Sequence, residues 1–198
     1  MPIPDQATVE SALDPYHSTI REIVLSAWGD WLRNPDASLY QFNRTRACIV
    51  WEHMVRRAQE AFLDDPSVQC VEKHNTCHFF IDNSILLRFK KADERGLSCN
   101  YPTSLALDFH DPEAALPGFP EVSRVEVIYI VNELGTGVDS VQVVARNGSR
   151  VAWSYDIPGQ PVAPVEPIPT THKPATKPSQ MVTVRKPDKT LKDQANES

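Results

Sequence analysis

The stretch VDSVQVVARNGSRVAWSYDI, residues 138–157, decides the fold of this chain. Apolar and polar residues alternate on both sides of Asn147-Gly148. This alternation indicates two strands, because successive side chains of a strand point to opposite faces. Asn-Gly between two such runs is the strongest short signal for a β-hairpin, since both turn positions favour a positive φ. The sequence therefore predicts an antiparallel pair of strands that ends near Ile157.

The chain before this hairpin has the same period of two. Four further strands are expected over residues 68–73, 77–81, 84–91 and 122–132. Asp82-Asn83 predicts a turn between the second and third of them. Residues 103–109 are apolar and too few for their period to distinguish a strand from a helix.

Two helices are expected before the strands. The first begins at Asp14-Pro15, because Asp14 can accept N-terminal backbone N–H bonds and Pro15 suits the first helical position. It ends at Asn34-Pro35, and the second helix runs from near residue 36 or 38 to about Leu63. Two helices followed by five or six mostly hairpin-connected strands predict an α+β fold, in which helices cover one face of an antiparallel sheet.

Proline divides the chain into two parts. Of its 17 Pro residues, eight lie between Pro158 and Ser198. That segment carries six basic and four acidic residues, so its formal charge is +2. Because the whole chain carries −6, residues 1–157 carry −8. Such a segment buries too little apolar area to offset about 1–2 kcal/mol of backbone entropy per residue. We therefore expect a single domain over residues 1–157 and a disordered Pro/Lys-rich tail over 158–198.

The composition argues against direct nucleic-acid binding and against a membrane protein. An acidic domain disfavours strong direct nucleic-acid binding, because Lys and Arg that neutralise phosphates dominate such affinity. A transcriptional cofactor would therefore need a basic partner. No apolar run approaches the roughly 18 residues of a membrane span, and residues 1–10 lack the pattern of a signal peptide. The expectation is a cytoplasmic protein with no membrane partner.

Cys70, His74, Cys77 and His78 are the residue types that bind zinc, and they lie close together. Their spacing argues against a metal site, because adjacent strand residues such as Cys77 and His78 point to opposite faces. No second pair with zinc-site spacing is present to complete a tetrahedron. We expect no metal and no cofactor, with buried thiols and a hairpin histidine instead.

The best candidates for catalysis are Asp108, His110 and Asp111. Two acids beside a histidine suit acid/base or metal-assisted hydrolysis, with Glu126 as a possible fourth member. The alternative is a segment end followed by an Asp-Pro turn, where such residues are common. No nucleophile motif, P-loop or dinucleotide-binding glycine pattern is present.

A basic loop is the best candidate for contact with a partner. Its predicted partner-binding residues are Arg88, Lys90, Lys91, Arg95, Asn100 and Thr103. Clustered basic side chains can bind a phosphate or an acidic protein surface. The alternative is a solvated edge strand, where Lys and Arg discourage unwanted strand pairing.

Part of the chain resembles a known family. The resemblance lies in RFKKADERGLSCNYPTSLALDF at 88–109, in LPGFP at 116–120, in the following strand with Tyr129 and Asn132, and in NGSRVAWSYDI at 147–157. Over roughly residues 68–157 the chain resembles small prophage and mobile-element proteins. These look like the first gene of two-gene toxin–antitoxin or phage-defence operons, whose second gene joins a helix-turn-helix domain to an IrrE-type peptidase-like domain. The resemblance implies no catalytic residues, and the tail departs from it.

Two hypotheses follow. The first is a toxin-like protein that acts through protein–protein interaction and is neutralised by a cognate antitoxin-like protein of the helix-turn-helix and IrrE type. The rival hypothesis is a small nuclease or hydrolase that uses Asp108, His110 and Asp111.

Overall fold

The computed structural model describes residues 3–73, 75–98, 103–114, 116, 118 and 122–159. All of them belong to the compact unit Met1–Val162. The predicted tail, apart from its first two residues, lies outside the described residues, as do His74 and Asn100. In the part of the chain that is described, no helix is long and apolar enough to cross a membrane.

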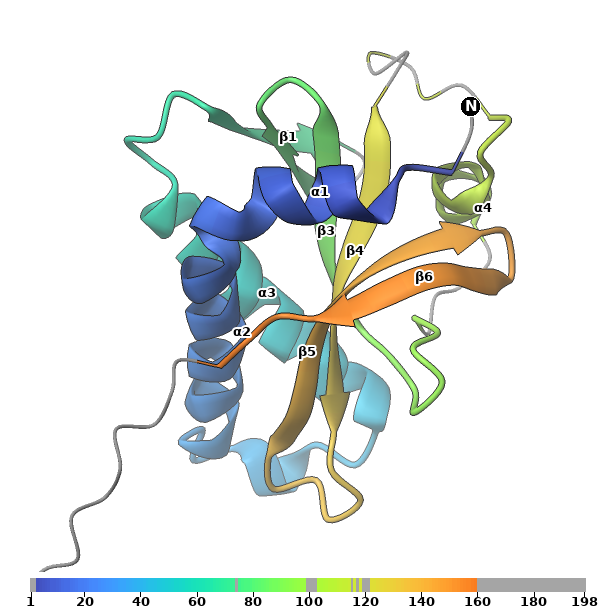
Figure 1. Cartoon of the computed structure of the whole chain (residues 1–198). Coiled ribbons are helices and arrows are strands. Elements are labelled where there is room, and N and C mark those ends of the chain that lie inside the picture. Colours follow the sequence, from blue (N-terminus) through green and yellow to red (C-terminus); the bar gives the residue numbers. More distant parts are fainter. Residues whose placement is uncertain are drawn as a thin grey trace, which may run out of the picture. The chain divides into compact units, whose positions relative to one another are not determined.

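The chain forms helices first and then a sheet (Figure 1). The helical part contains α1 (Gln6–Leu13), the 3-10 turn η1 (Asp14–Tyr16), α2 (His17–Leu32), the 3-10 turn η2 (Ala37–Leu39) and α3 (Asn43–Ala61). The rest contains β1 (Val68–Lys73), β2 (Thr76–Ile81), β3 (Ile85–Lys91), α4 (Ser104–His110), β4 (Ser123–Val131), β5 (Val138–Asn147) and β6 (Arg150–Asp156). The strands form one six-stranded sheet in the order β1 to β6. The predicted α+β class with helices on a mostly antiparallel sheet is confirmed.

The helix boundaries differ from the prediction at both helices. Helix α1 was not predicted; its N-cap is Asp5, whose carboxylate accepts the Thr8 N–H at 2.9 Å. Asp14-Pro15 therefore does not begin a helix but forms the 3-10 turn between α1 and α2. Helix α3 begins at Asn43, later than expected. Before it, the Asn34 side chain accepts the Asp36 N–H, and the 3-10 turn η2 follows.

One strand pair is parallel, unlike the others. Strands β3 and β4 run in the same direction, with Arg88 beside Glu126 and Phe89 beside Val127. Parallel neighbours require a crossover connection, since a two-residue turn cannot reverse the chain twice. Residues 92–122 provide this crossover, and the undecided segment 103–109 is part of its helix α4.

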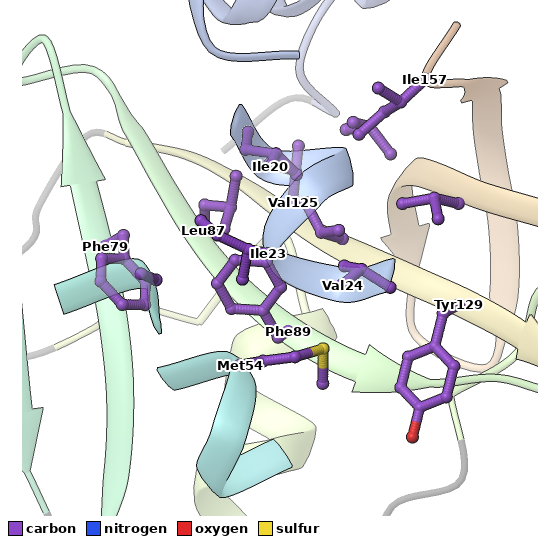
Figure 2. Packing of buried hydrophobic residues seen from close by; sticks show 14 of the residues in the cluster. Ile20, Ile23, Val24, Met54, Phe79, Leu87, Phe89, Val125, Tyr129 and Ile157 are labelled. Carbon is purple, nitrogen blue, oxygen red and sulfur yellow. The ribbon is translucent and has the colours of Figure 1, made fainter. Parts of the chain in front are cut away.

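The main core lies between the sheet and helices α1 to α3. Phe79, Leu87, Phe89, Val125 and Tyr129 project from β2, β3 and β4 toward α2 and α3, as Figure 2 shows. Alternate residues of these strands share this face because of the strand period of two. The helices therefore cover one face of the sheet, and the residues between the core residues project from the other face.

Helix α4 covers part of the second face. Phe109 of α4 packs with Leu86 of β3 and Val122, and a separate cluster joins Ala92, Ile128 and Val144. Between these two small apolar clusters the strands carry charged side chains, which form the candidate site described below.

The C-terminal hairpin differs from the prediction by one residue. Asn147 is the last residue of β5 and pairs with Arg150, so the turn consists of Gly148 and Ser149. Only Gly148 has a positive φ, +57°. Its N–H donates to the carbonyl of His110 at 2.7 Å. This bond attaches the hairpin to α4.

Phe79 tests the main core. It is fully buried, and its ring lies 6.0 Å from that of Phe62 and 5.7 Å from that of Phe89. We expect Phe79→Ala to lower the free energy of unfolding by about 3–5 kcal/mol in urea denaturation, because it leaves a cavity. Phe42→Ala is the matched control, since Phe42 is 72% exposed and should change stability little. Equal losses in the two variants would contradict the described core.

Candidate functional site

A buried ion pair lies at the centre of the second face. Nε and Nη2 of Arg88 donate to Oε1 of Glu126 at 2.9 and 2.7 Å. The two residues are direct neighbours across the parallel strands β3 and β4. Glu126 is 1% exposed and Arg88 is 7% exposed. The guanidinium also lies over the Phe109 ring, 3.8 Å from its centroid. Neither charge is available at the surface, so their mutual pairing is what makes their burial tolerable.

Three further side chains join this pair, and we call the five residues the buried network: Arg88, Ser98, His110, Glu126 and Arg146. Ser98 donates its hydroxyl to Oε2 of Glu126 at 2.8 Å, and Arg146 donates to Ser98 Oγ at 3.0 Å. Nε2 of His110 lies 2.7 Å from Nη2 of Arg88 and 3.1 Å from Oε1 of Glu126. The network thus connects β3, β4 and β5 to α4 and to the loop after β3.

His110 is buried, and this disfavours its charged form. Its Nε2 lies between a guanidinium, which only donates, and a carboxylate, which only accepts, so it accepts from Arg88 or donates to Glu126 according to the tautomer. Burial lowers the pKa of His110 below its usual value, and the hydrogen bond and charge of Glu126 oppose this only in part. Burial alone would raise the pKa of Glu126, but its hydrogen bond with His110 and the charge of Arg88 hold that pKa at about 2. At neutral pH the pair is therefore ionised beside an uncharged imidazole.

Arg124 attaches α4 to the sheet. Its Nη1 donates to the carbonyls of Asp108 and Asp111 at 2.8 and 2.9 Å, and its Nη2 donates to the carbonyl of Ala114. These are among the carbonyls that a helix leaves without partners at its C-terminus. The bonds fix the end of α4, so His110 is held over Glu126.

The structure separates the three candidate catalytic residues. His110 points into the buried network, whereas Asp111 is exposed and follows α4. Asp108 is half-buried and contacts Arg124 through its backbone carbonyl. The carboxylate beside His110 is Glu126, whose lone pairs are already used by Arg88 and Ser98. No observation brings Asp108, His110 and Asp111 to one point where a substrate could react.

The candidate zinc ligands are also separated. Cys70 and Cys77 approach each other on the helix-facing side of β1 and β2, while His78 lies on the second face, with its ring 5.6 Å from that of Phe109. Burial and the charges of Arg88 and Lys90 lower the pKa of His78 to about 4. Among the described residues, no group of three or more His, Cys, Asp or Glu side chains could hold a metal ion.

The predicted partner-binding residues have three different environments. Arg88 is 7% exposed and belongs to the buried network, where it pairs with Glu126. Lys91 and Arg95 line an open hollow of about 370 Å³ together with Arg46, Asp93 and Glu133. Thr103 is the exposed N-cap of α4, where its hydroxyl accepts the Ala106 N–H.

Lys90, the remaining described residue of the predicted loop, is half-buried. Burial and the charge of Arg88 lower the pKa of its ammonium group. Lys90 therefore belongs to the surroundings of the buried network more than to a contact surface.

Three exposed apolar side chains lie in chain segments that adjoin residues of the hollow, and sequence reasoning did not single them out: Leu134 lies between Glu133 and Gly135, and Leu39 and Phe42 precede Arg46. We call Leu39, Phe42 and Leu134 the end patch; they are 72%, 72% and 83% exposed. Leu39 and Phe42 precede α3, and Leu134 lies in the β4–β5 turn. These segments meet through Arg46 of α3, which lines the hollow beside Gly135 and reaches over the Trp28 ring. In the sequence, the only indication of this surface was the presence of these three large apolar residues in two segments that otherwise look like loops.

Glu126 tests the buried network. We expect Glu126→Gln to lower the free energy of unfolding by about 3–5 kcal/mol, because Arg88 then stays buried without a counter-charge. The exposed Glu133 is the control, and Glu133→Gln should stay within about 0.5 kcal/mol of the unchanged protein. The double variant Arg88→Met, Glu126→Leu should recover much of the loss, since it removes both charges. A Glu126→Gln protein with unchanged urea midpoint would contradict the described pair.

His110 tests the protonation state. Because the pKa of His110 is lower in the folded protein than its ordinary value of about 6.5, the unfolded chain binds a proton at a higher pH than the folded protein does. The contribution of neutral His110 to the free energy of unfolding is therefore complete above pH about 6.5 and is lost as the pH falls toward the folded-state pKa. We expect the free energy of unfolding to decrease from pH 7 to 5, and His110→Gln to flatten this decrease. An NMR titration that places His110 at or above its ordinary pKa would contradict this.

Comparison of the chain with protein-family models, with curated proteins and with solved structures finds no match. The family resemblance of residues 68–157 therefore stays a prediction.

Proposed function

We propose that this protein is a cytoplasmic, toxin-like component of a toxin–antitoxin or phage-defence module that acts by binding other proteins. The resemblance described above suggests the module and a cognate antitoxin-like partner with helix-turn-helix and IrrE-type domains. The observation that carries the binding role is the end patch.

The end patch has the composition of a binding surface. Apolar side chains as exposed as Phe42 and Leu134 cost free energy in water, and a partner that contacts several of them together gains from their burial. Phe42 is the extended N-cap residue of α3 and Leu134 lies in the β4–β5 turn, and neither position requires a large apolar side chain. A partner that covers them would bury them and gain the hydrophobic free energy.

The hollow beside the patch supplies a polar border. Its basic residues Lys91 and Arg95 are accompanied by acidic residues, and Arg95 donates to Asp93 at 3.1 Å. An apolar centre with a polar border is the usual anatomy of a protein–protein interface. The mixed charge favours a protein surface with hydrogen-bonding groups of both kinds over a nucleic-acid backbone.

Co-expression with the product of the neighbouring gene tests the proposal. The tagged chain should recover that product, and Phe42→Ser or Leu134→Ser should weaken the complex by about tenfold or more, because central apolar contacts dominate interface energies. Leu63→Ser is the matched control. Leu63 is 79% exposed but follows the other end of α3, whose 19 residues span about 28 Å at a rise of 1.5 Å per residue.

The outcomes distinguish two parts of the proposal, the toxin-like role with its partner and the end patch as the surface that the partner contacts. Failure to recover the neighbouring product, together with no effect of the chain on bacterial growth, would overturn the toxin-like role. Recovery that Leu63→Ser weakens as much as Phe42→Ser does would leave the pairing and reject the end patch as its contact surface.

A further inference from the structure

Two cysteines meet across the β1–β2 hairpin. The Sγ atoms of Cys70 and Cys77 lie 3.1 Å apart, which is about 1 Å farther than in a disulfide. Cys70 pairs with Phe79 and Cys77 pairs with Glu72, so the two cysteines are diagonal neighbours on the same face of antiparallel strands. Diagonal neighbours of this kind are close enough for long side chains to touch. The two sulfurs therefore have about 1 Å to close before an S–S bond can form.

The two thiols have different surroundings. Cys70 is exposed on the edge strand β1, and Nε2 of Gln59 donates to its sulfur at 3.5 Å. Cys77 is 4% exposed but lines an open hollow of about 520 Å³ between α3 and the hairpin. Burial, followed by the contact with Cys70, raises the pKa of Cys77. A small oxidant in solution therefore meets Cys70 first, and Cys77 is placed to react with the product.

We infer that Cys70 and Cys77 form a reversible redox pair, which a peroxide closes into a disulfide across the β1–β2 hairpin. The Cys70 thiol releases its proton to solvent, and its thiolate attacks one oxygen of hydrogen peroxide; the O–O bond breaks, leaving Cys70 sulfenic acid and a hydroxide that takes a proton from solvent to become water. The Cys77 sulfur then attacks the Cys70 sulfur, an S–S bond forms, and the sulfenic oxygen leaves as a second water. Each peroxide is reduced to two waters, and two thiols are oxidised to one disulfide. A thiol reductant reverses the step by exchange.

Thiol counting on the full chain tests this inference. The reduced, unfolded protein should titrate four thiols, one for each cysteine, and brief treatment of the folded protein with hydrogen peroxide should leave two. The mass should fall by about 2 Da, the loss of two hydrogens, and dithiothreitol should restore it.

Peptide mapping locates the bond. Trypsin cleaves after Arg57, Lys73 and Arg88, so Cys70 and Cys77 fall in separate peptides, 58–73 and 74–88. These two peptides should be found linked in the oxidised protein and separate after reduction.

Two serine variants make the test decisive. Cys48→Ser removes an exposed cysteine of α3 and should still lose two thiols. Cys70→Ser should lose none to a disulfide, and it should fold because Cys70 is exposed. Peroxide that oxidises Cys48 as fast as Cys70, or that yields stable sulfinic acid in place of the linked peptides, would overturn the inference.

Discussion

The ion pair between Arg88 and Glu126 is the interaction on which the second face of the sheet depends. It joins β3 to β4, the only parallel neighbours in the described sheet, at a place where both side chains are withdrawn from water. Two buried charges tolerate such a place only when each satisfies the other. Ser98 and His110 contact the pair directly, and Arg146 contacts Ser98 and His110, so the crossover helix and the last hairpin are positioned through it. The arrangement is that of a structural network, whereas the contacts proposed for a partner lie on the exposed end patch.

The fold class could be predicted from the sequence because local patterns determine it. Strand alternation around Asp82-Asn83 identified a turn in which both residues have a positive φ. The features that could not be predicted depend on contacts distant in sequence. Most of the undecided segment 103–109 lies in α4 (Ser104–His110), whose C-terminal carbonyls accept hydrogen bonds from Arg124 on β4. The hairpin turn consists of Gly148 and Ser149, one residue later than the predicted Asn147-Gly148, and the Gly148 N–H donates to the His110 carbonyl.

The site was less predictable than the fold. Charged Arg88 and Glu126 within largely apolar stretches of β3 and β4 were visible in the sequence, but only the parallel register shows that they are neighbours. His110 was a reasonable candidate because its type suits chemistry, yet sequence proximity to Asp108 said nothing of where its ring points. Exposed apolar residues such as Phe42 cannot be distinguished from core residues by type, since burial is a property of the folded chain.

The parallel junction also has a consequence for how this domain folds. Strands β1 to β3 and β4 to β6 are two sets of consecutive antiparallel strands, each built from residues close in sequence. Only the pairing of β3 with β4 requires a long loop to close, with its entropic cost. We therefore expect the two halves of the sheet to gain structure early and their association to set the folding rate, since non-local pairing is the slow step in β proteins. The charges at the junction are then the last to leave water.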